Sequence, residues 1–297
     1  MRAAAIFGLG CSEKDLKPFR TDKSIDWLTE LPSSSAQQAD IILVFGGDGT
    51  VHRHLSRLVE LETPVLIVPS GSGNDFARAL GLHSVRDALG AWRRFCTGEN
   101  NVRCIDLGTI QPTSEDAKTR NSVLGIRHHF CSIAGLGLDA EVTRRANGLP
   151  RWLRANGGYM LSLFSTVFRF SPLPIQILVP DEQTGSSTRS RRPTLLAAFA
   201  NTSTYGDGMK IAPRAKMDDG QLDVCVIGSI HPFKLACMFL TVYFGRHLDI
   251  RGVEYFRAQR VRVETEMPAD IFADGEYVCR TPAEIGVHSK ALRIVTP

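Results

Sequence analysis

Apolar and polar positions alternate in two different ways along this chain, and the change of pattern divides it into two parts. In the first third, short apolar runs lead into glycine-containing turns, and amphipathic segments follow the turns. The pattern predicts strands at 3–7, 40–45 and 64–69, and helices at 24–31, 51–61, 75–82 and 84–95. Strand, turn and helix in repetition predict a mostly parallel sheet with helices on its faces.

From about residue 102 onward the pattern is typical of β structure. Strand-like apolar runs recur between turn-forming residues, which predicts a largely antiparallel second domain. Two apolar helical insertions are expected near 151–170 and 232–248. Ordinary core helices would explain them, and so would an apolar wall for lipid chains with basic residues facing anionic headgroups.

Composition narrows the class of protein. The 297 residues are 43% hydrophobic and 22% charged, which is enough to bury a core in one large or two medium domains. The net charge of +4 suits an anionic ligand or membrane face, and the lack of a basic tail argues against a nucleic-acid partner. Seven cysteines without a C-x-x-C pair predict reduced thiols in a cytoplasmic protein. No apolar run reaches spanning length, so a membrane would be met only at its surface.

Two glycine-rich loops stand where a predicted strand meets a helix, "GGDGT" at 46–50 and "SGSGN" at 70–74. Glycine permits close backbone approach, and N–H groups at a helix start favour an anion such as phosphate. A tight turn with Asp48 as a helix cap is the other interpretation of the first loop. Because neighbouring parallel strands end at the same sheet edge, the two loops are expected to adjoin and embrace a polyphosphate. The carboxylate of Asp48 among phosphates then indicates Mg²⁺-nucleotide chemistry.

Two acidic segments in the second part have a structural and a functional interpretation. The segment "DDGQLD" at 218–223 clusters three carboxylates beside a glycine, a composition typical of a hairpin turn. The segment "ADGE" at 273–276 also fits a hairpin with Asp-Gly at its corner. Neither segment requires a functional explanation when it is taken alone.

In combination, these motifs resemble the diacylglycerol kinase catalytic-domain family, which includes bacterial soluble lipid kinases and the sphingosine and ceramide kinases, and which shares its fold with NAD kinases. The resemblance covers nearly the whole chain. It departs from the family at "IFGLGCSEKD", where an Asn-Pro-x-x-Gly loop is common, and at His52 and Arg53, where Asn-Glu is usual. The matching segments, in family order, are "GGDGTV" (46–51), "PSGSGNDFARALG" (69–81), "CIDLG" (104–108), the glycine-rich β segment "AGLGLDAEV" (134–142), "YGDGMKIAPRAKMDDGQLDVCVI" (205–227) and "ADGEYV" (273–278).

The resemblance implies a nucleotide-binding α/β domain of the NAD-kinase and diacylglycerol-kinase type at 1–106 plus 288–297. A C-terminal antiparallel β-sandwich domain at 107–287 would bind lipid and metal and close the cleft. ATP and Mg²⁺ are the implied cofactors. The implied magnesium ligands are the Asp219 side chain and the backbone carbonyls of Lys216 and Gln221. The implied nucleotide-binding residues are Gly46, Gly47, Asp48, Gly49, Thr50, Ser70, Gly71, Ser72, Gly73 and Asn74.

The implied reaction moves the γ-phosphate of ATP to a lipid hydroxyl at the membrane surface. Diacylglycerol is the leading acceptor, giving phosphatidic acid; monoacylglycerol, a sphingoid base, phosphatidylglycerol and an unrelated small alcohol remain alternatives. Glu276 is expected to accept the hydroxyl proton and Asp48 to orient the metal or the hydroxyl, with the reverse assignment left open. NAD-kinase-like activity and a nucleotide sensor without catalysis are the other hypotheses. A cytoplasmic protein with peripheral membrane association is expected, and a homodimer is an expectation from the family alone.

Overall fold

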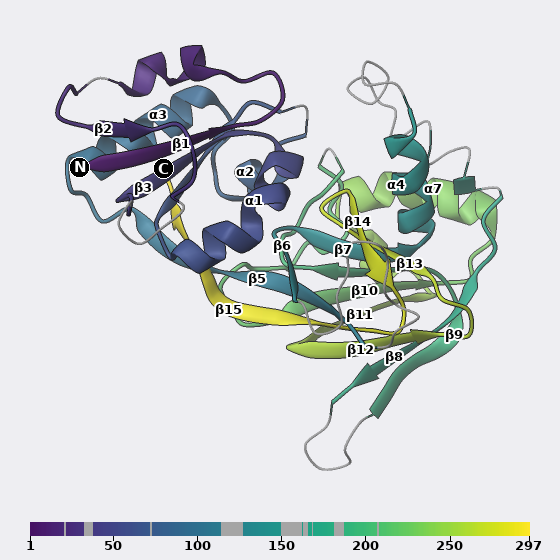
Figure 1. The fold of residues 1–297 in the computed structure, drawn as a ribbon. Helices are drawn as coiled ribbons and strands as arrows, with labels where there is room; N and C mark the ends of the chain where they lie inside the picture. Colours follow the sequence, from purple (N-terminus) through teal and green to yellow (C-terminus); the bar gives the residue numbers. More distant parts are fainter. Residues whose placement is uncertain are drawn as a thin grey trace. The chain divides into compact units, whose positions relative to one another are not determined.

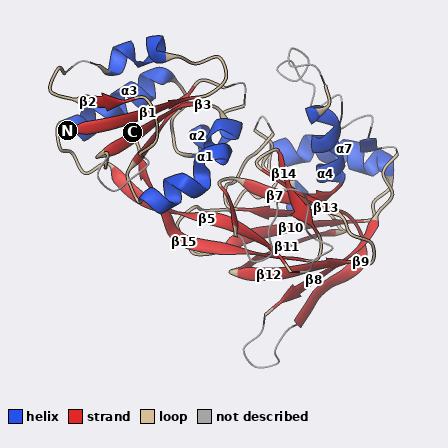
Figure 2. Ribbon diagram, in the orientation of Figure 1, coloured by secondary structure: helices blue, strands red, loops and turns tan. Residues whose placement is uncertain are grey.

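Figures 1 and 2 show the helices and strands of the protein in a computed structural model. The described residues are 1–20, 22–32, 38–71, 73–113, 127–149, 162, 166–167, 169–180, 187–206 and 208–297. The chain folds into two compact units, Met1–Asp106 with Ser289–Pro297, and Leu107–His288. Two strands, β5 (Val102–Pro112) and β15 (Ala283–Val295), contribute residues to both units.

The first unit contains a parallel sheet whose central strands are apolar along their whole length. The strand order is β2-β1-β3-β4-β15, and every neighbouring pair is parallel. All residues of β3 and β4 are buried, as expected for a parallel sheet with helices on both faces, and this confirms the predicted fold class. The elements are β1 (Arg2–Phe7), η1 (Glu13–Phe19), β2 (Asp26–Leu28), β3 (Ile41–Gly46), α1 (Asp48–Leu61), β4 (Val65–Pro69), α2 (Asp75–Ala79) and α3 (Val85–Cys96).

The segment 24–31 was predicted as a helix, and this prediction is wrong. The segment contains β2, which pairs in parallel with the beginning of β1. Trp27 of this strand packs on Trp92 of α3, with 5.5 Å between the ring centroids. A single short helix is marginal in isolation, whereas the strand gains a sheet partner and an aromatic contact.

The second unit is an antiparallel β structure, as predicted. Its strands follow the order β14-β13-β7-β9-β8-β12-β15, while β10 lies between β9 and β11, and β5 pairs with β15 and β6. The strands are β5 (Val102–Pro112), β6 (His128–Phe130), β7 (Ile133–Gly137), β8 (Leu173–Val179), β9 (Ser187–Ala200), β10 (Leu222–Gly228), β11 (Val253–Ala258), β12 (Arg260–Thr265), β13 (Asp270–Ala273) and β14 (Glu276–Arg280). Its helices include α4 (Leu138–Asn147), α7 (Pro232–Tyr243) and η4 (His247–Asp249).

Strand β10 separates two apolar cores in the second unit. Val224 and Val226 belong to the core between the strands of the sandwich, whereas Cys225 and Ile227 belong to a core shared with α4 and α7. Successive side chains of a strand point to opposite faces, so every residue of β10 is buried. Figure 1 shows α4 and α7 beside each other on this second core.

The glycine-rich segment 134–142 is a strand only in its first half. Gly137 adopts φ +84°, and α4 begins at the next residue, so the expected β segment ends there. A side chain at Gly137 would also press on the carbonyl of Leu195 at 2.5 Å, so glycine suits both the bend and the close approach.

The two expected helical insertions have different outcomes. Most of 151–170 lies outside the described residues, whereas 232–248 forms α7 and the beginning of η4. Within the described part of the chain, every helix is too short or too polar to span a bilayer.

Candidate active site

The first glycine loop joins β3 directly to α1. Gly46 ends the strand, Gly47 is the N-cap, and the helix begins at Asp48. A Cβ on Gly46 would lie only 2.5 Å from Oγ1 of Thr50, so glycine is required for this turn. The first turn of a helix leaves its N–H groups without intrahelical acceptors, and the helix dipole makes this end positive. The loop therefore has the features of an anion-binding turn.

The second glycine loop packs backbone against backbone on the first. A Cβ on Gly71 would lie 2.5 Å from Cα of Gly47, and Ser70 N donates to the carbonyl of Gly46 at 3.1 Å. The two loops adjoin at the carboxyl ends of β3 and β4, as the pattern of parallel strands predicts. Ser72, one of the expected nucleotide ligands, lies outside the described residues.

Asp48 connects the first loop to the helix that follows the second loop. Its Oδ2 accepts a hydrogen bond from Asp75 N at 2.9 Å, and its Oδ1 accepts one from Phe76 N at 3.0 Å. These N–H groups belong to the first turn of α2, so Asp48 caps a helix other than its own. The carboxylate holds the two loops in register, which the sequence did not reveal.

Asn74 closes the second loop on itself. The residue adopts φ +57°, and its side chain both accepts from Gly71 N at 2.9 Å and donates to Gly71 O at 2.7 Å. Asn is among the few residues that tolerate this left-handed conformation. The loop is thus shaped by its own side chain.

A third loop, which follows β1, lies beside both glycine loops. Gly8 N donates to the carbonyl of Phe45 at 2.7 Å, and a side chain at Gly8 would collide with Thr50. Burial raises the pKa of the Cys11 thiol, and a hydrogen bond with Ser70 opposes this rise. This loop belongs to the segment "IFGLGCSEKD", which departs from the family pattern. The departure therefore lies next to the candidate nucleotide site.

The acidic segment at 273–276 forms a tight hairpin between β13 and β14. Asp274 and Gly275 both have positive φ, +49° and +84°, as a type I′ turn requires. The Asp274 carboxylate accepts from Cys131 N at 2.7 Å and from Ser132 N at 2.8 Å. Glu276 is the exposed first residue of β14 and is therefore held on a well-anchored hairpin.

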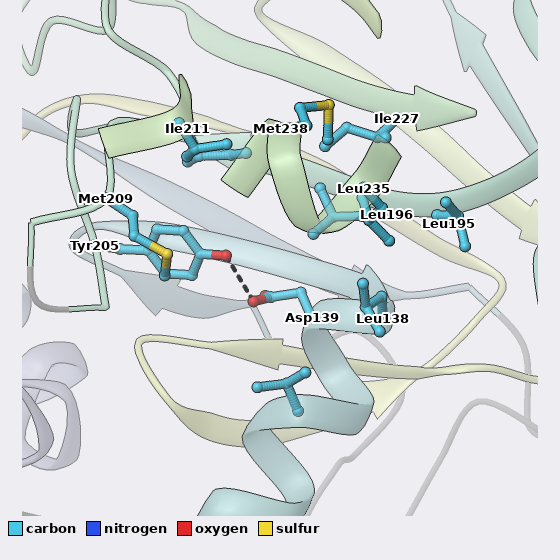
Figure 3. Close-up of a pocket in the computed structure, with 12 residues that line it drawn as sticks. Leu138, Asp139, Leu195, Leu196, Tyr205, Met209, Ile211, Ile227, Leu235 and Met238 are labelled. Carbon is cyan, nitrogen blue, oxygen red and sulfur yellow. Dashed lines mark hydrogen bonds between the residues drawn. The ribbon is translucent and has the colours of Figure 1, made fainter. Parts of the chain in front are cut away.

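A mainly apolar cavity lies between the sheet of the second unit and its helices (Figure 3). The empty space around it, about 450 Å³, includes open solvent, and only a small part of it is enclosed. Its polar lining side chains are Asp139 and Tyr205, and Tyr205 OH donates to Asp139 Oδ1 at 2.7 Å. Its apolar lining consists of Leu138, Val142, Leu195, Leu196, Met209, Ile211, Ile227, Leu235, Met238 and Val242.

The carboxylate of Asp139 depends on a glycine of the preceding strand. A side chain at Gly135 would collide with Asp139 Oδ2, so the small residue leaves room for the acid. Asp139 is buried, and it stands in the first turn of α4, where the helix dipole favours a negative charge. The motif "GLGLDA" thus places one acid at the wall of an apolar cavity.

The segment 218–223 forms a turn with its own carboxylate hydrogen bond. Asp219 Oδ1 accepts from Gln221 N at 3.1 Å across Gly220, whose φ is +71°. Asp219 Oδ2 lies 3.5 Å from Nη1 of Arg257, a weak contact at the surface. The turn interpretation is therefore correct for the backbone, and it leaves the metal hypothesis untouched.

The atoms near this turn that could bind a metal are mainly oxygens, and a hard cation such as Mg²⁺ prefers oxygen ligands. Asp223 is fully buried; Tyr255 OH donates to its Oδ1 at 2.7 Å, while its Oδ2 has no partner among the described residues. Burial raises the pKa of Asp223, and the hydrogen bond from Tyr255 and the charge of Arg257 oppose this rise. Among the described residues, no three His, Cys, Asp or Glu side chains form a metal-binding group. A magnesium held by Asp219 together with the backbone carbonyls of Lys216 and Gln221 stays a prediction.

Comparisons with known sequences match both parts of the chain. A model of the diacylglycerol kinase catalytic domain matches residues 12–110, and a model of the YegS C-terminal NAD kinase beta sandwich-like domain matches residues 132–296. A diacylglycerol kinase of Mycobacterium tuberculosis is 32% identical over 267 residues, covering 90% of this chain and 80% of the relative. A diacylglycerol kinase of Bacillus subtilis is 25% identical over 266 residues, covering 89% and 80%.

The fold is also similar to that of a solved structure. The crystal structure of a diacylglycerol kinase from Bacillus anthracis aligns with all of this chain and 97% of its own, with a TM-score of 0.66 and 20% identity. At that identity the likeness concerns the fold alone. Because the family models match both units and a relative above 30% identity covers most of the chain, the protein belongs to the diacylglycerol kinase family.

Proposed function

We propose that the protein is an ATP- and Mg²⁺-dependent kinase that phosphorylates the free hydroxyl of a lipid, with diacylglycerol as acceptor and phosphatidic acid as product. The observation that carries the lipid assignment is the cavity of the second unit, which is apolar except for Asp139 and Tyr205. An acyl chain is expected to bind such a lining because the contact removes apolar surface of both from water. The polar pair gives the acceptor headgroup hydrogen-bonding partners at the cavity wall.

The two glycine loops are proposed to hold the phosphates of ATP. Their contact at Gly47 and Gly71 brings the two loops together beside the positive end of α1, where a phosphate is favoured. Ser70 N and Gly71 N already donate to Gly46 and Asn74, so these two groups shape the loops. Asp48 keeps this arrangement rigid by capping α2. We assign Asp48 the role of orienting the phosphates, their metal or the hydroxyl through this loop geometry.

Glu276 is proposed as the general base. It accepts the proton of the lipid hydroxyl while the hydroxyl oxygen forms a bond to the γ-phosphorus and the bond from that phosphorus to the β,γ-bridging oxygen breaks, so that ADP leaves. Asp274 anchors the hairpin that carries Glu276. When bound, Mg²⁺ would neutralise phosphate charge, and Asp219 with the carbonyls of Lys216 and Gln221 would hold a structural ion.

A transfer assay with ATP labelled at the γ-phosphate tests this proposal. Dispersed diacylglycerol and NAD are offered to the same preparation, with and without Mg²⁺. We expect label in phosphatidic acid only, and only when Mg²⁺ is present. Label in phosphorylated NAD alone would assign the protein to the other activity of this fold. Tight ATP binding without transfer to either acceptor would favour a nucleotide sensor.

A further inference from the structure

Helix α7 carries large apolar side chains on the face that points to solvent. Phe233, Leu240 and Phe244 are 70%, 70% and 75% exposed. They are seven and four residues apart, a spacing that aligns them in one stripe along the helix and its C-cap. Isolated exposed apolar residues are ordinary, but a row of three on one helix indicates a binding surface.

The opposite face of the same helix forms a wall of the cavity. Leu235, Met238 and Val242 are buried and line the apolar space, and Figure 3 shows Leu235 and Met238 directed into it. A helix that is apolar on both faces is normally enclosed by protein or lipid on both sides. Among the described residues, the side chains that pack on α7 lie on the cavity side, and the other side is left with exposed apolar side chains. An apolar environment on that side would cover them.

Basic side chains flank the exposed stripe. Lys234 is exposed on the first turn of α7, and Arg246 is exposed just beyond its end. Lys210 is also exposed, and its backbone N donates to the carbonyl of Val242 in the last turn. In the described part of the chain none of these three cations forms an ion pair, and the exposed acids nearest to them in sequence are Asp218 and Asp249. This charge distribution complements an anionic bilayer surface.

We propose that the outer face of α7 is a membrane-docking surface. Phe233, Leu240 and Phe244 enter the boundary between headgroups and acyl chains of an anionic bilayer, and the flanking cations meet lipid phosphates. The lipid acceptor then needs only to pass α7 to reach the cavity on its other side. This inference rests on the proposed function, because it assigns the docking surface to the entry of the lipid acceptor.

A bilayer fits the stripe better than a second copy of the chain does. Three side chains of this size cannot supply the roughly 800 Å² per partner that a stable protein interface buries. A bilayer requires no such minimum area, because apolar insertion and charge attraction each add to the binding. Cations beside an apolar stripe are also typical of helices that lie at a membrane surface.

Vesicle binding of the full chain tests the proposal directly. The triple variant Phe233→Ser, Leu240→Ser, Phe244→Ser is compared with wild type and with Met267→Ser, which alters a 78% exposed apolar residue of the same unit outside α7. Co-sedimentation uses vesicles of phosphatidylcholine with phosphatidylglycerol, and vesicles of phosphatidylcholine alone. We expect the triple variant to lose at least about tenfold in affinity for the anionic vesicles, and Met267→Ser to match wild type.

Turnover on two forms of the acceptor separates docking from folding. The triple variant should phosphorylate long-chain diacylglycerol in vesicles much more slowly, yet retain wild-type turnover of a short-chain diacylglycerol dissolved as monomers. Unchanged vesicle binding by the triple variant would overturn the proposal. A wild-type dimer that the triple variant converts to monomer, with vesicle binding unaltered, would assign the stripe to a second copy instead.

The failure of the proposed function would be visible separately. If wild-type protein phosphorylates neither form of diacylglycerol, the acceptor assignment fails, whereas the vesicle measurement still decides whether α7 docks on membranes. A further variant, Lys234→Gln with Arg246→Gln, should weaken binding to the anionic vesicles and leave the weaker binding to phosphatidylcholine unchanged. Equal loss on both kinds of vesicle would contradict the assigned role of the cations.

Discussion

Gly47 and Gly71 lie so close together that a Cβ on Gly71 would be 2.5 Å from Cα of Gly47. The contact joins two loops that leave neighbouring parallel strands, and it leaves no space for a side chain at Gly71 and very little at Gly47. Both loops must therefore keep their backbones in contact if they are to present N–H donors to one polyphosphate.

Gly71→Ala should separate the two loops and weaken ATP use. Displacement of binding groups by about 1 Å can lower reaction rates by roughly a hundredfold, so we expect kcat/KM for ATP to fall by at least about tenfold. Gly90→Ala is the matched control, because a Cβ at Gly90 in α3 meets no atom within 4 Å. Steady-state kinetics and ATP titration measure the effect. Equal kinetics for the two variants would show that the loop contact is not needed.

Asp48→Asn should reduce stability as well as turnover. The new amide group would face one of the backbone N–H groups of α2 as a donor, leaving that N–H without its acceptor, at about 1–3 kcal/mol of unfolding free energy. Denaturant unfolding measures this loss, with Glu60→Gln on the exposed side of α1 as control. Lost turnover at unchanged stability would instead assign Asp48 a purely chemical role.

Glu276→Gln tests the proposed base. Because Glu276 is exposed on its hairpin, the amide should leave folding and ATP affinity unchanged while kcat falls by about 10²- to 10⁴-fold. Glu266→Gln, another exposed acid of the second unit, should behave as wild type. If the Glu276 variant keeps its kcat and Asp48→Asn does not, the roles of the two acids are reversed.

Filling the cavity should discriminate between acceptors by chain length. Leu196→Trp places a larger ring in the empty space, so turnover of long-chain diacylglycerol should fall more than turnover of a short-chain form. Leu196→Met conserves volume and should restore the long-chain rate. If turnover of the long-chain and short-chain forms falls equally at unchanged stability, acyl chains bind elsewhere.

His129 should make stability depend on pH between about 6.5 and 4. Burial lowers the pKa of His129 from its ordinary value of 6.5 to about 4, with further contributions from His288, Arg127 and His128. In this window the unfolded chain binds a proton that the folded chain does not, so stability falls as pH falls and is fully present above pH 6.5. For a side chain that is partly exposed, we expect a loss of about 1–2 kcal/mol.

Denaturant unfolding at a series of pH values measures this loss. His129→Gln removes the titrating group and can retain a hydrogen bond to Nδ1 of His288, which lies 3.0 Å from His129 Nε2. The variant should therefore show a flatter dependence of stability on pH. A slope equal to that of wild type would show that other groups control the acid transition.

The fold was predictable from the sequence where the buried residues of an element form a pattern that is visible in a short segment. The apolar run Ile41–Gly46 is buried at every residue, and its fate as a central strand follows from composition alone. The strand Asp26–Leu28 was missed because three residues carry almost no periodic signal, and it is stabilised by β1 and by Trp92. The helix α4 was missed because Gly137 turns a strand into a helix within one residue.

The candidate site was predictable only in its local parts. Glycine loops and acidic turns are visible in short segments, since their chemistry depends on neighbours in the chain. Asp139 and Tyr205 are 66 residues apart, and Asp223 and Tyr255 are 32 apart, so their pairing depends on tertiary structure. In the sequence, Asp139 is visible as a single acid that follows two glycines in "GLGLDA". Its place at the cavity wall became clear only from the structure.

One incubation tests the central claim most directly. Wild-type protein receives MgATP and equal amounts of diacylglycerol, monoacylglycerol, a sphingoid base, phosphatidylglycerol and NAD, and mass spectrometry identifies the phosphorylated products. A lipid kinase with an apolar acceptor cavity should give phosphatidic acid as the main product and leave NAD unmodified. Phosphorylation of NAD with every lipid unchanged would contradict the claim.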